Sequence, residues 1–151
     1  MRRARDLMHI SWDALQALDL QDKSPYFNVD GTPYHCLIAK PFDRRMLDDL
    51  GDLATCIRRI AKSKVGTSFL RELLMHKRAM LYFSQPSSRT FLSFYAACQI
   101  LGLQPAEVRD TTTSSEMKGE SPEDTVRTFS SYFDIIIMRT PRQVVAEKMA
   151  W

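Results

Sequence analysis

Residues 83–94 read Phe-Ser-Gln-Pro-Ser-Ser-Arg-Thr-Phe-Leu-Ser-Phe, and they join an apolar run to an amphipathic segment. The apolar run, residues 79–83, has the length and composition of a buried parallel strand. After the polar turn, apolar side chains recur at helical spacing; they are Phe91, Phe94, Tyr95, Cys98 and Leu101. The stretch therefore predicts a strand, a turn and a helix in direct succession.

The turn at residues 87–90, called the 87–90 turn below, has the composition of an anion-binding site. Ser87, Ser88 and Thr90 supply hydroxyl groups, and the first backbone N–H groups of a helix have no partner within that helix. The helix dipole favours negative charge at this end, and Arg89 adds a forked cation. We therefore expect a phosphate group to bind here.

Upstream of this strand, a stripe of apolar residues predicts a helix that Asp43 caps. The members of the stripe are Met46, Leu47, Leu50, Leu53, Ala54, Ile57, Ile60 and Ala61. Gly66 is expected to end this helix region, and residues 68–74 to form a further turn. Residues 1–41 predict a short helix over residues 11–18 and a turn-rich passage, to which we assign no function.

Downstream of the 87–90 turn, the alternation of strands and helices continues. In chain order we expect a helix end at Gly102, a short strand at 107–110, a polar exposed loop at 110–120, a helix capped by Ser121, a strand at 135–138 that ends at Arg139, and a helix from Thr140-Pro141 to Trp151. The whole pattern alternates strand and helix three times.

This order predicts an α/β fold, a three-layer sandwich with a small parallel sheet and helices on both faces. Ligands of such sheets bind at the carboxyl ends of the strands. The 87–90 turn follows the first strand, the polar loop at 111–119 follows the second, and Arg139 ends the third. All three groups are therefore expected at one edge of the sheet.

The composition narrows the class of protein. The chain has 151 residues, of which 44% are hydrophobic and 26% charged, as expected for one globular domain. Its net charge of +3 is too small to indicate binding to nucleic acid or to a membrane. Cys36, Cys56 and Cys98 are widely spaced, which indicates reduced thiols in a cytoplasmic protein. We expect no metal, no cofactor and no membrane-spanning segment.

Four segments together resemble one known family. Residues Ser87-Ser88-Arg89-Thr90 with Ser93-Phe94 are similar to the Ser-Thr-Arg-Thr-Arg-x-Ser-Phe motif of the aspartate and ornithine carbamoyltransferases. The other three matching segments are Lys118-Gly119-Glu120 followed by Asp124-Thr125, Tyr132-x-Asp134, and Ile137-Met138-Arg139. Good correspondence covers about residues 80–141, and the combination is highly specific.

The resemblance implies that the chain is the N-terminal, carbamoyl-phosphate-binding domain of such an enzyme, closest to the aspartate type. Donors fixed around the substrate would stabilise the negative charge that builds on the carbonyl oxygen and then on the leaving phosphate. By resemblance, the catalytic candidates are Arg89, Thr90, Arg139 and Lys118, and the substrate-binding candidates are Ser87, Ser88, Arg89, Thr90, Arg139, Ser114 and Lys118.

The resemblance also implies a trimer, in which Ser114 and Lys118 lie on a loop that reaches the active site of a neighbouring subunit. A lysine here favours aspartate as the acceptor, in pyrimidine biosynthesis, because it can pair with a carboxylate. Thr140 points the other way, since the aspartate enzymes usually carry a histidine after this arginine. The identity of the acceptor amine therefore stays open.

The chain departs from the family pattern in several places. Ser88 replaces a threonine and keeps its hydroxyl, whereas Phe91 replaces the second arginine of the motif and removes a charge. The His-Pro-x-Gln motif that polarises the carbonyl in the family does not occur after Arg139. We therefore expect an N-terminal extension of unassigned role at 1–41, an incomplete carbamoyl-phosphate domain at 42–151, no amino-acid-binding domain, and no turnover by this chain alone.

Two other functions remain open. The chain could be a non-catalytic remnant or interaction module that keeps the family's fold, because an apolar strand at 135–138 without a fourth strand beside it is an edge that a partner must cover. That partner would be another copy or a full-length relative. General nucleotide binding is less favoured, because the sequence holds neither Gly-x-Gly-x-x-Gly nor a Gly-Lys-Ser/Thr loop.

Overall fold

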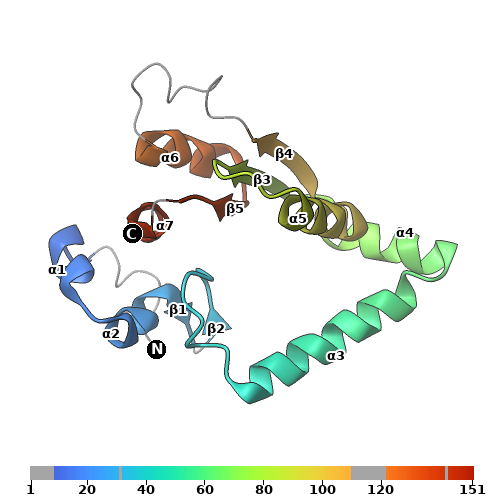
Figure 1. Cartoon of the computed structure of the whole chain (residues 1–151). Helices are drawn as coiled ribbons and strands as arrows, with labels where there is room; N and C mark the ends of the chain where they lie inside the picture. Colours follow the sequence, from blue (N-terminus) through green and yellow to red (C-terminus); the bar gives the residue numbers. More distant parts are fainter. Residues whose placement is uncertain (1–8, 31, 110–121, 142) are drawn as a thin grey trace. The chain divides into compact units, whose positions relative to one another are not determined.

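The computed structural model describes residues 9–30, 32–109, 122–141 and 143–151, and the chain divides into two compact units (Figure 1). One unit comprises Met1–Asp52 with Ala146–Trp151, and the other comprises Leu53–Val145. Helix α3 (Arg44–Ile60) runs from the first unit into the second, and α7 (Gln143–Ala150) runs from the second into the first. Among the described residues, no helix is long and apolar enough to cross a membrane.

The first unit is built from short elements around Leu15 and Phe27, which are both buried. They are α1 (Trp12–Ala17), α2 (Leu20–Lys23), the 3-10 helix η2 (Ser24–Phe27), and an antiparallel pair of β1 (Asn28–Val29) and β2 (Thr32–Pro33). The helix expected near residues 11–18 is confirmed as α1, and Ser11 Oγ accepts a hydrogen bond from Ala14 N at its start. The sequence did not predict the β1–β2 pair, because two-residue strands leave no periodicity.

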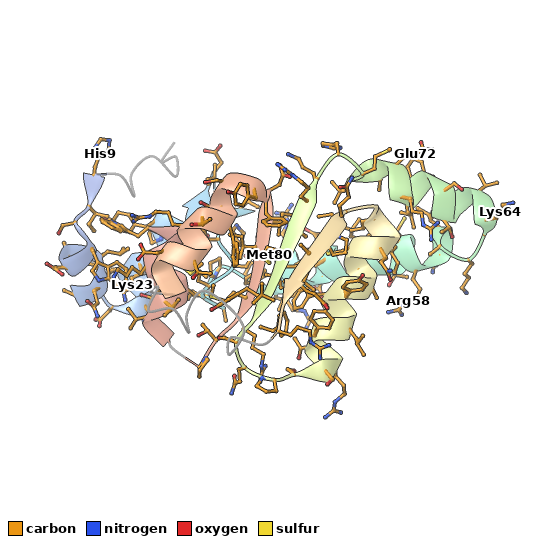
Figure 2. All side chains as sticks on the ribbon, turned by 90° about the horizontal axis from the view of Figure 1, so that it is seen from above. His9, Lys23, Arg58, Lys64, Glu72 and Met80 are labelled. Atoms are coloured by element: carbon orange, nitrogen blue, oxygen red, sulfur yellow. The ribbon has the colours of Figure 1, made fainter. Side chains whose placement is uncertain are left out.

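The second unit is built on a parallel sheet of three strands in the order β4-β3-β5 (Figure 1). These strands are β3 (Arg78–Phe83), β4 (Gln104–Val108) and β5 (Ile135–Arg139). Every residue of β3 after Arg78 is buried, as the continuous apolar run predicted for a central strand. Figure 2 shows Met80 in the middle of this sheet.

Helices cover both faces of the sheet. Neighbouring residues of a strand point to opposite faces, and the Phe83 ring lies 5.5 Å from Phe91 of α5 (Ser88–Leu101). The Tyr82 ring lies instead 5.9 Å from Phe129 of α6 (Pro122–Tyr132). The predicted α/β sandwich of three layers, with α5 and α6 on opposite faces, is therefore confirmed.

Helix α5 ends where the sequence predicted. Gly102 follows its last residue with φ 81°, a left-handed conformation that favours glycine. A Cβ at this position would overlap the carbonyl oxygen of Arg71 in α4 (Lys64–Leu73). Glycine is therefore required both by the backbone angle and by the close approach of α4.

Expectations from the sequence were wrong in detail at three places along the chain. Residues 68–74 do not form a separate turn, because most of them belong to α4 (Lys64–Leu73). Gly66 does not end a helix either. It lies in the first turn of α4, where its N–H donates a hydrogen bond to the capping Ser63 Oγ. The second strand lies at Gln104–Val108 rather than at 107–110. Pro105 does not prevent a strand here, because β4 is at the edge of the sheet, where a proline without an N–H is tolerated. The last helix begins at Gln143, not at residue 140 or 141.

Helix α3 begins as the sequence predicted, since Asp43 Oδ1 accepts a hydrogen bond from Met46 N at 2.8 Å. The helix itself is confirmed with its apolar stripe, although α3 contains no buried residue. Leu47, Leu50 and Leu53 are 52%, 45% and 55% exposed. Periodicity establishes which face of a helix is apolar, but it does not establish what covers that face.

Candidate anion-binding site

The parallel register brings the ends of the strands to one edge of the sheet. Phe83, the last residue of β3, pairs with Arg139, the last residue of β5. Tyr82 pairs with Val108, the last residue of β4. The 87–90 turn, which follows β3, and Arg139 therefore belong to the same edge, as the topology inferred from the sequence required.

The 87–90 turn is held by hydrogen bonds among its own groups. Ser87 Oγ donates to Thr90 Oγ1 at 2.9 Å, and the Ser87 carbonyl accepts from Phe91 N at 3.0 Å. Ser87 makes no side-chain cap bond to the start of α5, so its hydroxyl does not satisfy the first N–H groups of the helix. Ser88 and Arg89 are exposed, while Ser87 and Thr90 are half-buried. The turn thus presents hydroxyl, guanidinium and helix-start donors together.

Arg139 adds a second donor group beside this turn. Its carbonyl oxygen accepts hydrogen bonds from Ser84 Oγ at 3.3 Å and Gln85 N at 3.4 Å, which tie the end of β5 to the segment just before the turn. Among the described residues, its Nε is buried and has no hydrogen-bond partner. Buried polar atoms are normally paired, so this donor is suited to an anionic ligand.

Arg109 is a third cation at the same edge, and the sequence alone did not single it out. It directly follows β4, and its Cζ lies 4.4 Å from the centroid of the Phe91 ring. Phe91 stands where the family motif has its second arginine, so a cation lies over the position that has lost one. No signal in the sequence pointed to this role, because Arg109 lay inside the strand expected at 107–110, whereas β4 ends at Val108.

Two predicted residues, Ser114 and Lys118, lie outside the described residues, as do the rest of the loop expected at 110–120 and the capping residue Ser121. Thr140, which follows Arg139, is half-buried. Across the described ranges, no group of three or more His, Cys, Asp or Glu side chains could hold a metal ion. The described residues at this edge offer hydroxyl, backbone N–H and guanidinium donors.

The fold and these donors define the class, an α/β domain suited to an anion at the carboxyl edge of a parallel sheet. The chain belongs to the aspartate/ornithine carbamoyltransferase family, because residues 34–151 match the model of that family's carbamoyl-P binding domain. This match extends beyond the segments that carry the sequence motifs, and it includes α3 and α4.

Individual relatives agree with the family. The chain is 38% identical over 107 residues to the aspartate carbamoyltransferase catalytic subunit of Methanosarcina acetivorans, covering 71% of this chain and 33% of the relative. It is 40% identical over 112 residues to the chloroplastic aspartate carbamoyltransferase of Arabidopsis thaliana, covering 74% of this chain and 28% of the relative. The chain thus spans about a third of the length of these relatives.

A solved structure supports the same assignment at the level of the fold. Aspartate transcarbamoylase from Trypanosoma cruzi, in complex with carbamoyl phosphate, matches with a TM-score of 0.64 and 36% sequence identity. The match covers 74% of this chain and 34% of that one.

Proposed function

We propose that this chain binds carbamoyl phosphate through the 87–90 turn and Arg139, as the carbamoyl-phosphate half of an aspartate carbamoyltransferase-type enzyme. Such an enzyme transfers the carbamoyl group to the amine of aspartate in pyrimidine biosynthesis. The observation that carries the proposal is the buried, unpaired Nε of Arg139 among the described residues, at the sheet edge that also holds the turn. The Trypanosoma cruzi relative whose structure contains carbamoyl phosphate supports the choice of ligand.

The donors have separate roles in this proposal. Ser87, Ser88 and Arg89 hold the phosphate at the start of α5, where the helix dipole favours an anion. Thr90 and Arg139 lie near the carbonyl oxygen, which gains negative charge when the amine attacks the carbamoyl carbon. Because these donors are already fixed by the fold, little reorganisation is needed as that charge forms.

Isothermal titration of the purified chain with carbamoyl phosphate tests the proposal. We expect saturable binding, and we expect Arg89→Ala to weaken it by on the order of 2 kcal/mol, the scale of hydrogen bonds to a charged group. Arg58→Ala, an exposed arginine of α3 that Figure 2 labels, is the matched control and should bind as the wild type does. Absence of binding by the wild type, or equal affinity of Arg89→Ala, would refute the assignment.

We also propose that the active assembly is a homo-oligomer, a trimer by family resemblance, in which Ser114 and Lys118 serve a neighbouring copy. The 151 residues contain no His-Pro-x-Gln motif after Arg139, so the chain alone is expected to bind carbamoyl phosphate without transferring its carbamoyl group. Carbamoyl aspartate formed by the purified chain would contradict this expectation. Sedimentation velocity distinguishes a trimer from a monomer.

A second candidate is a non-catalytic interaction module. Within the described sheet, β5 is an edge strand and its first residue, Ile135, is 43% exposed, which favours pairing with another chain. A stable monomer without affinity for a full-length relative would count against this candidate.

We propose a cytoplasmic location for either function, supported by the free thiols Cys36, Cys56 and Cys98, and fractionation of the source cells tests it.

A further inference from the structure

We propose that Arg109 is a positioning residue of the anion site, held on the Phe91 ring so that its positive charge replaces the second arginine of the family motif. This inference rests on the proposed binding of carbamoyl phosphate. The observation behind it does not depend on that proposal: the Arg109 guanidinium lies over the Phe91 ring, with Cζ 4.4 Å from the ring centroid.

The Phe91 ring is a rigid platform for a cation. It is only 4% exposed, and two further aromatic rings contact it. Phe83 meets it edge-on at 5.5 Å with an interplanar angle of 89°, and Tyr95 lies 5.7 Å away on the same helix. A guanidinium over a ring face within about 6 Å is attracted by the ring's quadrupole. The platform therefore restrains an arginine whose side chain is otherwise exposed.

The platform directly adjoins the 87–90 turn. Phe91 directly follows Thr90, and its backbone N–H donates to the Ser87 carbonyl at 3.0 Å. A charge held on this ring acts on the start of α5, where the proposed phosphate binds. Because Arg109 comes from the end of β4, next to β3 in the sheet, cations from β4, α5 and β5 serve one edge.

The mechanism is electrostatic and does not require contact between Arg109 and the ligand. An exposed cation several ångströms from a phosphate contributes a modest, salt-sensitive attraction. We therefore expect Arg109→Met to weaken binding of both carbamoyl phosphate and inorganic phosphate by about threefold to tenfold at low ionic strength. The loss should shrink as salt is raised from about 0.05 M to about 0.5 M.

Titration calorimetry on five variants of the whole chain tests this role: Arg109→Met, Arg109→Lys, Arg58→Met, Phe91→Leu and the double variant of Phe91→Leu with Arg109→Met. Arg109→Lys keeps the charge and should restore most of the affinity, whereas Arg58→Met removes one exposed positive charge elsewhere and should leave affinity unchanged. In a Phe91→Leu background, which removes the platform, Arg109→Met should cause little further loss, so the two substitutions form a double-mutant cycle. If Phe91→Leu does not fold, the lysine rescue and the salt dependence decide the question.

The outcomes separate this inference from the proposed function. Binding by the wild type with equal affinity in Arg109→Met, or a loss in Arg109→Met that lysine does not reverse or salt does not reduce, would overturn the role of Arg109 and leave carbamoyl phosphate binding intact. A wild type that binds neither anion would overturn the proposed function, and the role of Arg109 with it.

Discussion

Phe83 and Arg139 are paired residues in the parallel register of β3 and β5, so the strand that leads into the 87–90 turn and the strand that ends in the candidate arginine finish at the same level. The Arg139 carbonyl further accepts hydrogen bonds from Ser84 and Gln85, the two residues after Phe83. Residues more than fifty positions apart in the sequence are thereby fixed at one sheet edge.

Substitution of Arg139 is expected to weaken binding of carbamoyl phosphate while leaving the free energy of unfolding nearly unchanged. We expect Arg139→Gln to lower affinity for carbamoyl phosphate by about 10- to 100-fold, because a charge-assisted hydrogen bond is lost. Its free energy of unfolding should fall by no more than about 1 kcal/mol, since among the described residues the buried Nε has no partner to lose. Calorimetric titration and urea unfolding measure the two effects. The exposed Arg127 of α6 provides the control, Arg127→Gln, which should change neither.

The hydroxyl group of Thr90 is expected to contribute more to the affinity for carbamoyl phosphate than the volume of its side chain does. Thr90→Val keeps the volume of the side chain but removes the oxygen that accepts the hydrogen bond from Ser87 at 2.9 Å, and affinity should fall about tenfold. Thr90→Ser keeps the oxygen and should remain within about threefold of the wild type. Equal affinities of the valine and serine variants would show that this hydroxyl does not contact the ligand.

Gly102 is expected not to tolerate alanine. Gly102→Ala must place a Cβ at φ 81° and against the Arg71 carbonyl, so the free energy of unfolding should fall by about 2 kcal/mol or more. Gly51→Ala is the matched control. It lies within α3 with nothing within 4 Å of an added Cβ, and it should raise helix stability by about 0.5–1 kcal/mol. Thermal melting of both variants should show shifts of opposite sign.

Asp134 makes stability depend on pH at the start of β5. Its carboxylate accepts hydrogen bonds from Arg78 N at 2.9 Å and Lys77 Nζ at 3.0 Å. These bonds, the backbone one foremost, hold the pKa of Asp134 below its ordinary value of 3.8. The unfolded chain therefore binds more protons just below that value, and the stabilisation present above it is lost as the pH falls through the folded pKa.

Asp134→Asn should accordingly lower the urea midpoint at neutral pH and flatten its dependence on pH in the acid range. The difference from the wild type should narrow as the pH is lowered below about 3.8. Asp48→Asn removes a carboxylate from an exposed pair with Arg44 at 3.0 Å and should have little effect, as exposed helix pairs contribute little. A constant gap between Asp134→Asn and the wild type at all pH values would contradict the linkage.

Local patterns in the sequence predicted the elements where a single physical cause dominates. The apolar run at 79–83, the glycine at 102 and the cap at Asp43 each depend on neighbours within a few residues, and each is present in the structure. Predictions failed where a distant partner decides. Gln104 begins β4 because its N–H bonds to the Lys77 carbonyl at 3.0 Å, a contact that no local pattern of residues encodes.

The sequence by itself determined the alternation of strands and helices after residue 78, the three-layer class and the residues of the 87–90 turn, because hydrophobic periodicity and turn chemistry are properties of short segments. The tertiary structure alone decided that Arg109 lies on Phe91 and that the Arg139 Nε is buried. Both results come from the register of parallel strands, which brings residues distant in sequence together and fixes the direction of their side chains. A cation that directly follows β4 thereby lies over the position in α5 where the family motif has its second arginine.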